Sequence, residues 1–220
     1  MKRAYSIQNI SDAKFKTIEL DGEWSDAIGT PELTGSWFIY GAPKNGKTTF
    51  ALLLSKYLTK FGRVAYNSIE EGLSLTMQMA MERVRMAEIG SRLILLEKED
   101  TNELMARLRR HKSPDIIVID SVQFMELKWT EYKKLKETFP NKLFIYISHI
   151  EGKQPEGNVA KRIWRDANVY FKIEGFRAFP VSRYGGGDYI DVCTEKANVY
   201  WGFEGKERSC VGQMESCSTN

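Results

Sequence analysis

Cysteine is scarce in this sequence, and long apolar runs are missing from it. The three cysteines, Cys193, Cys210 and Cys217, form no Cys-x-x-Cys pair and have no histidine cluster beside them. We therefore expect neither a zinc site nor a disulfide framework, and such cysteine usage is typical of the reducing cytoplasm. No apolar segment approaches the ~18–20 residues that cross a bilayer, so we expect no membrane-spanning helix. The basic N-terminus also lacks the apolar stretch of a signal peptide.

Charge of one sign is not in large excess either. The 32 Lys and Arg residues nearly balance the 29 Asp and Glu residues, which leaves a net charge of +3. A basic surface for nucleic acid would therefore have to be local. The 220 residues suffice for one domain with a sizeable core and are too few for two large ones. We predict one domain over residues 1–205 and a loose polar tail over 206–220.

Apolar strand patterns alternate with helical patterns through the first two thirds of the chain. We expect strands over 36–40, 63–67, 93–96, 115–120 and 142–148, and helices after residue 48 and over 73–84, 102–112 and 129–139. This alternation predicts an α/β fold with a mainly parallel sheet flanked by helices. Beyond residue 149 we expect a polar, charged loop over 151–165. Strands over 169–173, 178–183 and 189–193 would then add antiparallel strands to one edge of the sheet.

One segment matches the phosphate-binding pattern GxxxxGK[ST] at every required position. Its glycines allow backbone N–H groups to surround a phosphate, and the following helix directs its positive N-terminal end at that charge. The lysine reaches the β- and γ-phosphates, and the threonine hydroxyl takes a place on Mg²⁺. A chance turn rich in Gly and Pro is the alternative, but the segment lies between a predicted strand and a predicted helix, as this chemistry requires. The residues expected to bind the nucleotide are Gly41, Ala42, Pro43, Lys44, Asn45, Gly46, Lys47, Thr48 and Thr49.

An aspartate ends the apolar run 115–120. Ligands of open α/β sheets bind at the carboxyl ends of strands, so Asp120 would lie beside the phosphates. A carboxylate there can hold magnesium through water, as the acidic residue of P-loop ATPases does. We therefore predict Thr48 and Asp120 as the metal residues, with an ordinary strand-end cap as the alternative for Asp120. Asp115 begins the same strand and lies at its far end.

Three further polar residues follow predicted strands in the same way. Glu70 and Glu71 come after the strand 63–67, and His149 comes after the strand 142–148. One glutamate could polarise the water that attacks the γ-phosphate, although adjacent acids are often simply a solvated loop. His149 could hydrogen-bond the γ-phosphate or have a structural role. The spacing leaves these alternatives open.

Several segments together resemble the RecA-like ATPases, and most closely the RadA (Sms) branch of bacterial recombination proteins. The segments are 41–49, 66–72, 119–123, 147–152 and 182–185. The resemblance implies that Glu70 is the catalytic glutamate, with Glu71 as the alternative if the alignment shifts by one residue. It also implies that Asp120 binds magnesium, that His149 senses the γ-phosphate, and that Arg183 is an arginine finger completing a neighbouring subunit's site.

The sequence departs from that branch in identifiable ways. Val181 stands where relatives carry a lysine, two positions before Arg183. Neither the zinc module ahead of the core nor the C-terminal protease-like domain of RadA has a counterpart in these 220 residues. We therefore expect an ATPase core without those two parts.

In RecA-like ATPases, the loops after the strands that correspond to 115–120 and 142–148 grip single-stranded DNA. The resemblance therefore implies a DNA-binding homo-oligomer, a ring or a filament. Basic residues beside an aromatic residue such as Trp164 suit a strand whose phosphates are neutralised and whose bases stack. A solvated charged face is the alternative. The residues expected to contact DNA are Lys153, Lys161, Arg162 and Arg165.

These expectations combine into one leading hypothesis and two alternatives. The leading hypothesis is an Mg²⁺-dependent ATPase of RecA-like type that acts on single-stranded DNA in recombination, repair or replication. The first alternative is an ATP-dependent switch for a protein partner, in which DNA has no part. The second is a small-molecule kinase, although the sequence shows no lid-like arginine cluster. No guanine-reading NKxD motif occurs, which favours ATP.

Overall fold

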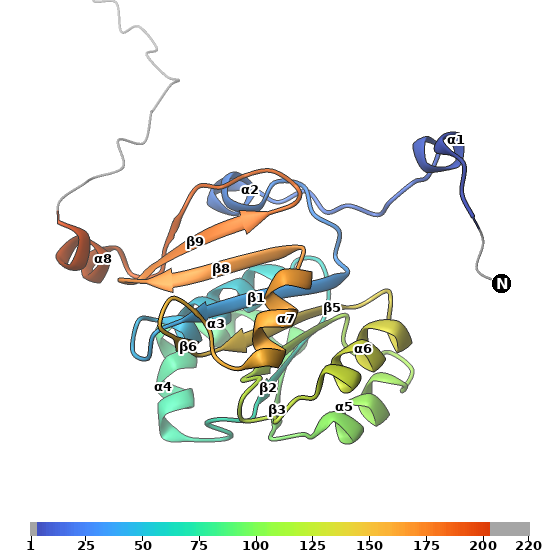
Figure 1. Ribbon diagram of the computed structural model, residues 1–220. Coiled ribbons are helices and arrows are strands. Elements are labelled where there is room, and N and C mark those ends of the chain that lie inside the picture. The colour runs from blue at the N-terminus through green and yellow to red at the C-terminus, as the bar shows by residue number, and fades with distance from the viewer. Residues whose placement is uncertain (1–3, 203–220) are drawn as a thin grey trace, which may run out of the picture.

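A single eight-stranded sheet organises the protein, whose computed structural model describes residues 4–202 (Figure 1). The strand order is β10-β9-β8-β1-β5-β4-β2-β3. The strands are β1 (Gly35–Gly41), β2 (Val64–Ser68), β3 (Leu93–Glu97), β4 (Ile116–Asp120), β5 (Leu143–Ser148), β8 (Val169–Glu174), β9 (Arg177–Ser182) and β10 (Ile190–Asp191).

Helices cover both faces of the sheet, since successive strand residues point to opposite sides and both sides are apolar. In β1, Trp37 and Ile39 belong to one core, whereas Phe38 and Tyr40 belong to the other. The first core also contains residues of α2 (Gly22–Ile28), α3 (Lys47–Leu58), α4 (Leu75–Arg83) and the 3-10 helix η1 (Met86–Arg92). The second contains residues of α5 (Thr101–Leu108), α6 (Trp129–Thr138) and α7 (Asn158–Asp166).

The predicted parallel sheet is confirmed. Strands β8, β1, β5, β4, β2 and β3 all run parallel to one another. Strands β9 and β10 then extend the β8 edge in antiparallel fashion, as the late strand pattern predicts. Because β1, β2, β4 and β5 run the same way, their carboxyl ends meet at one edge of the sheet (Figure 1).

The predicted loop over 151–165 is wrong in part. A short hairpin of β6 (Ile150–Glu151) and β7 (Gln154–Pro155) is followed by α7, which includes most of the expected basic contacts. Ala160 and Ile163 bury one side of this helix against the sheet, and its charged residues lie on the other side. Two buried positions among mostly polar residues are a weak periodic signal. The predicted helix over 73–84 also begins later, at Leu75, because the Ser74 hydroxyl caps it by accepting the Met77 N–H.

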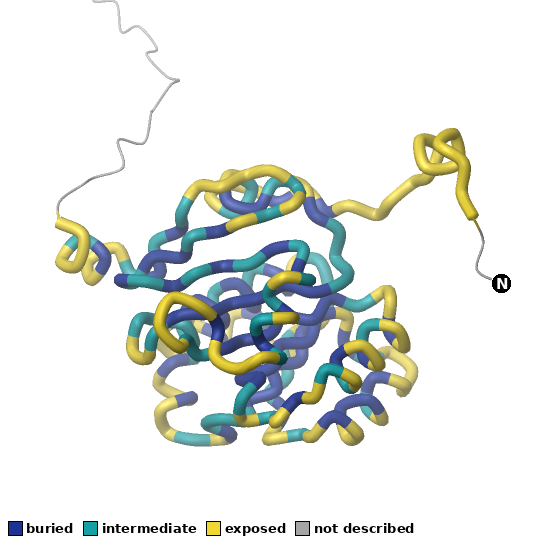
Figure 2. The backbone as a smooth tube through the Cα atoms, viewed as in Figure 1, coloured by how far each residue is buried: buried dark blue, intermediate teal, exposed yellow. Residues whose placement is uncertain are grey.

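The N-terminal arm stands apart from the sheet. Residues 4–17 are all exposed, and they include α1 (Ile7–Ser11) (Figures 1 and 2). At the other end, α8 (Thr194–Trp201) packs beside the tip of β8. None of the helices within residues 4–202 is long and apolar enough to cross a membrane. The predicted tail over 206–220, with Cys210 and Cys217, lies outside the described residues.

Candidate nucleotide site

The glycine-rich loop lies between β1 and α3, where the sequence places it. Gly46 has φ 95°, a left-handed conformation that favours glycine, and it immediately precedes α3. A Cβ on Gly46 would lie 3.2 Å from side-chain carbons of Phe176 and Val192, and a Cβ on Gly41 would lie 2.3 Å from the Ile173 carbonyl oxygen. Both glycines are therefore required by their surroundings. The first N–H groups of α3 have no partners within the helix and are available to a phosphate.

Lys47 and Asn45 hold the loop in its curved form. The Lys47 ammonium donates to the Ala42 carbonyl oxygen at 3.0 Å. Burial lowers the pKa of Lys47, while the charges of Glu70 and Asp120 raise it. The Asn45 side-chain amide donates to the Pro43 carbonyl, and its oxygen accepts the Gly175 N–H at 2.9 Å. The lysine is thus already folded over the loop, close to two acids from other strands.

Asp120 ends β4 beside the loop and is only 6% exposed. Burial raises the pKa of this carboxyl to about 6, and the nearby charges of Glu70 and Glu71 add to the increase. Two groups lower the pKa of Asp120 and favour its charged form. The Tyr66 hydroxyl donates to Oδ2 at 2.5 Å, and Lys47 contributes a positive charge. A cation beside Asp120 would relieve the cost of burying its negative charge.

The geometry separates the two adjacent glutamates. The backbone N–H groups of Ile69 and Glu70 donate to the Asp120 carbonyl, at 2.7 and 3.0 Å, which ties the end of β2 to the end of β4. The Glu70 carboxylate lies 3.1 Å from His149 Nε2, across the carboxyl edge of the sheet. Glu71 instead accepts a hydrogen bond from Thr76 in the first turn of α4. Glu70 is therefore the glutamate that pairs with His149.

Sequence reasoning missed two residues of this network, Tyr66 and Gln123. The Gln123 side-chain amide donates to Ser148 Oγ at 2.8 Å and to the Glu156 carbonyl at 2.9 Å. Glu156 in turn donates its backbone N–H to the His149 carbonyl at 3.0 Å. The signal that could have identified them is a polar residue inside or directly after a buried strand whose carboxyl end lies beside Asp120 and Glu70. Tyr66 lies two residues before Ser68, the register partner of Asp120.

Arg183 lies at the opposite edge of the sheet from the loop of its own chain. Strand β9 runs antiparallel to β8, and Ser182 pairs with Val169, the first residue of β8. The loop follows the other end of β1, so about five strand residues, or ~17 Å, separate the two ends. Arg183 and Arg165 line one surface hollow there, together with Trp164 and Val181. Within one chain, Arg183 is therefore not part of the site that contains Lys47.

The other predicted DNA contacts are spread along the hairpin and α7. Lys153 is exposed at the turn between β6 and β7, and Lys161 lies 3.9 Å from Glu151. The Arg162 guanidinium lies over the Trp129 ring, 4.0 Å from its centroid. Because α7 runs back toward the start of β8, Arg165 lies at the far edge with Arg183. The structure thus does not bring these four cations together into one patch.

The residues at the carboxyl edge suit a magnesium nucleotide. The hydroxyl of Thr48 and the buried Asp120 carboxylate are oxygen ligands of the kind that Mg²⁺ prefers. Within residues 4–202, no group of three or more His, Cys, Asp or Glu side chains is placed to hold a metal ion. A metal here would therefore share its coordination with phosphate oxygens, which is the usual arrangement for Mg²⁺.

Comparison of the sequence with known proteins gives one partial relative. No family model matches the chain. A DNA repair protein RadA from Streptococcus pneumoniae is 30% identical over 102 residues. That segment is 46% of this chain and 23% of RadA, so the match spans less than a quarter of the relative's length.

Comparison of the structure gives broader matches at low sequence identity. The flagellar accessory protein FlaH from Methanocaldococcus jannaschii aligns with a TM-score of 0.56 and 17% identity, over 81% of this chain and 92% of FlaH. A KaiC-like protein from Pyrococcus horikoshii aligns with a TM-score of 0.53 and 14% identity, over 77% and 88%. A third solved structure, described as an ATPase domain, aligns with a TM-score of 0.52 and 14% identity, over 75% and 84%.

The raised pKa of Asp120 predicts a stability gain on neutralisation. Its carboxyl has a pKa of about 6 in the folded chain, against an ordinary value of 3.8. The folded state therefore holds this proton more tightly, so the contribution of protonated Asp120 is present below pH 4 and lost as the pH rises through 6. We expect Asp120→Asn to raise the free energy of unfolding at pH 7 by about 2 to 3 kcal/mol, with little gain at pH 4.

Urea denaturation in chelator-containing buffer at both pH values measures this difference without bound metal. Asp188→Asn, which neutralises an exposed carboxylate, is the matched control and should change stability little at either pH. Equal stability of Asp120→Asn and the unmodified chain at pH 7 would contradict the argument from burial.

The sheet order, the glycine-rich loop and the structural matches agree with one another. The loop connects the central β1 to α3, and an acid-terminated strand lies two places away in the sheet. The closeness to RadA is supported only by the 102-residue match. The chain has the fold of the RecA-like P-loop ATPases, as its motifs predict.

Proposed function

We propose that this protein is an Mg²⁺-dependent ATP hydrolase of RecA-like type. One observation carries the proposal: Lys47, Asp120 and Glu70 come from three different strand ends and act electrostatically on one another. The charges of Glu70 and Asp120 raise the pKa of Lys47, and the charge of Glu70 raises the pKa of Asp120. The burial of Lys47 and Asp120 and the repulsion between Asp120 and Glu70 are costly without a ligand, and the arrangement suits a polyphosphate with its metal.

Each group then has a defined role. The loop backbone surrounds the phosphates, Lys47 binds the β- and γ-phosphate oxygens, and Thr48 with Asp120 holds the metal. A magnesium ion held by Thr48 and Asp120 would supply positive charge to offset the negative charge that develops on the phosphate oxygens. Glu70 orients the attacking water and accepts its proton. His149 holds the Glu70 carboxylate at the strand edge and is the candidate contact to the γ-phosphate.

The two adjacent glutamates allow a matched test of this assignment. We expect Glu70→Gln to lower kcat by about 10²- to 10⁴-fold while Mg-ATP still binds, because the loop is intact and only proton transfer is lost. Glu71→Gln removes the same charge one residue away and should change kcat only a few-fold. Phosphate-release assays measure kcat, and binding of a fluorescent ATP analogue measures affinity.

Lys47→Ala is the reference variant for a damaged phosphate site and should show no turnover. Retained turnover in Lys47→Ala would mean that the assigned phosphate cradle is wrong. If Glu71→Gln lost activity and Glu70→Gln kept it, the catalytic role would move to Glu71.

We further infer that single-stranded DNA is the macromolecular substrate. The matched relative is named as a DNA repair protein, which supports this choice. The hairpin that carries Lys153 is connected to the nucleotide edge, because the Gln123 amide and the His149 carbonyl both bond to Glu156. Arg162 is stacked on Trp129 and presents a cation beside an aromatic ring on the same side of the sheet. A strand bound there would have its phosphates neutralised by these cations.

The DNA proposal predicts stimulated hydrolysis and a measurable salt dependence. We expect single-stranded DNA to raise the ATPase rate, and Arg162→Ala or Arg165→Ala to flatten the plot of log affinity against log salt. Each lost phosphate contact should reduce the slope by about 0.7 for single-stranded DNA. Lys134→Ala, an exposed lysine on α6, removes the same charge and should leave the slope unchanged. An unaltered slope in both arginine variants would remove those residues from the contact surface.

An ATP-dependent switch for a protein partner is the second candidate. The exposed apolar side chains of the N-terminal arm favour it, because Ile7, Ile10 and Phe15 are 82%, 61% and 66% exposed. Nucleotide-dependent association with a protein, without any effect of DNA on hydrolysis, would support this candidate against the first. Phosphate transferred to a metabolite, with no inorganic phosphate released, would instead indicate a small-molecule kinase.

The position of Arg183 supports a role in a neighbouring subunit's site. It lies at the sheet edge opposite its own loop, so it can complete a nucleotide site only in another copy. We expect Arg183→Ala and Lys47→Ala to be inactive separately and to recover part of the activity when mixed. In the mixture, an intact loop from the first variant meets an intact arginine from the second. Absence of any recovered turnover in phosphate-release assays would argue against a shared site.

A further inference from the structure

The tight turn between β8 and β9 forms one wall of the glycine-rich loop. Gly175 and Phe176 have φ 53° and 59°, which is the two-residue turn that suits the twist of a hairpin. Glycine adopts this backbone easily, whereas a residue with a side chain does so against steric resistance. The packing of the Phe176 ring against Gly46 offsets this cost. A Cβ on Gly46 would be only 3.2 Å from Phe176 Cδ1. An unfavourable backbone conformation is thus maintained where it packs on the loop.

The Gly175 peptide joins the loop to α8. Its N–H donates to Asn45 Oδ1 at 2.9 Å, and its carbonyl oxygen accepts the indole N–H of Trp201 at 3.1 Å. Asn45 in turn donates to the Pro43 carbonyl. Hydrogen bonds on either side of the Gly175 backbone therefore connect the end of α8 to the middle of the phosphate-binding loop.

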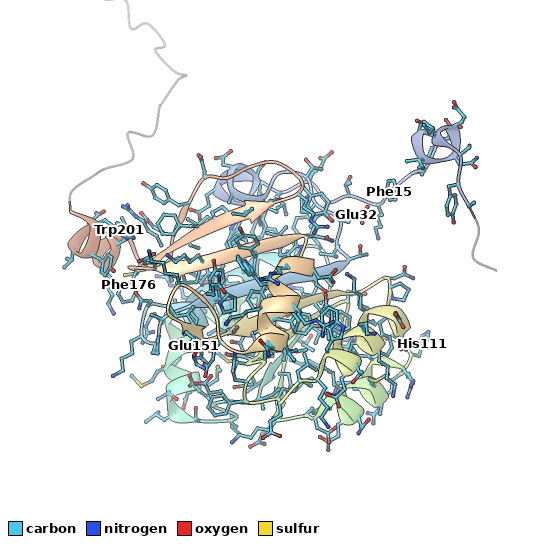
Figure 3. All side chains as sticks on the ribbon, viewed as in Figure 1. Phe15, Glu32, His111, Glu151, Phe176 and Trp201 are labelled. Carbon is cyan, nitrogen blue, oxygen red and sulfur yellow. The ribbon has the colours of Figure 1, made fainter. Side chains whose placement is uncertain are left out.

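Helix α8 is attached to the fold at this turn and at the adjoining part of β9, where Trp201 packs edge-on against Phe179. Ala197 is its one buried residue, and Val199 is 87% exposed. A Cβ on Gly175 would lie 2.2 Å from Tyr200 Cδ1 and 2.6 Å from Trp201 Nε1, so both side chains pack directly on the glycine. Figure 3 shows Phe176 and Trp201 at the same corner of the molecule. A helix with few buried contacts is free to follow the turn to which it is bonded.

We propose that Trp201 is a positioning residue for the nucleotide loop and that nucleotide binding is coupled to the packing of α8. Trp201 orients the Gly175 backbone, which holds Asn45 and thereby the curvature of the loop. A bound triphosphate would favour the same curvature and so tighten α8 onto the turn, since coupling between two sites is reciprocal. The inference rests on the proposed ATP site, but none of the catalytic groups takes part in it.

The first test separates affinity from turnover. Trp201→Phe keeps an aromatic ring on α8 and removes the indole N–H that reaches Gly175, together with part of the ring area that packs near Phe179. We expect the KM for Mg-ATP and the Kd for a non-hydrolysable analogue to rise about 3- to 10-fold, as expected for one lost hydrogen bond. The kcat should stay within about twofold, because Lys47, Asp120 and Glu70 are untouched. Tyr200→Phe, on the same helix, leaves the bond to Gly175 intact and should change neither constant.

The second test uses the unmodified chain, so it does not depend on the folding of a variant. Hydrogen exchange of the α8 amides over residues 194–201 is measured with and without the Mg-bound non-hydrolysable analogue. We expect exchange in α8 to slow at least threefold together with exchange in the loop 41–48. Loop protection without any change in α8, or an unchanged KM in Trp201→Phe, would overturn the coupling and leave the ATP site standing. Absence of protection in both segments, with no hydrolysis, would instead overturn the proposed function.

Discussion

The parallel register of the central strands is the constraint on which the site depends. Because β1, β5, β4 and β2 run in one direction, the residues that follow them gather at a single edge. Backbone bonds from Ile69 and Glu70 to the Asp120 carbonyl then fix two of these strand ends against each other. The loop, the buried acid and the Glu70–His149 pair are consequences of that alignment. Side chains that are remote in sequence become neighbours without any dedicated binding domain.

The electrostatics of this edge oppose the stability of the nucleotide-free fold. Asp120 is buried near two glutamates, and burial also disfavours the charged form of Lys47. A domain selected for stability alone would place apolar residues here, since a buried charge is costly. Stability is commonly lower at sites that need a strained or charged arrangement for function. The cost at Asp120 is thus the physical basis for proposing that a cation and a triphosphate belong here.

The two edges of the sheet have different chemistry. The carboxyl edge contains the candidate hydrolytic groups, and the opposite edge contains Arg165 and Arg183 around one hollow. Within a single chain the far arginines are separated from the loop by the length of a strand, so the proposed finger needs a second copy. Helix α8 lies beside the carboxyl edge and connects through Gly175 to Asn45. The loop is therefore connected through Gly175 to a helix that carries none of the sequence motifs.

Local features of the sequence determined the secondary elements, the parallel sheet and the position of the phosphate loop. Apolar runs such as 116–119 predict strands, and the spacing of Gly41, Gly46 and Lys47 predicts a phosphate loop. Both predictions succeed because they depend on interactions between residues a few positions apart. Helix α7 was missed because only Ala160 and Ile163 mark its buried side.

Only the tertiary structure decided which polar residues meet. Glu70 and His149 are 79 residues apart, and the Gly175 bond to Asn45 spans 130 residues. The separation of Arg183 from Lys47 follows from the antiparallel register of β9. Such pairings depend on strand order and register, which are set by the burial of the whole sheet rather than by any local pattern.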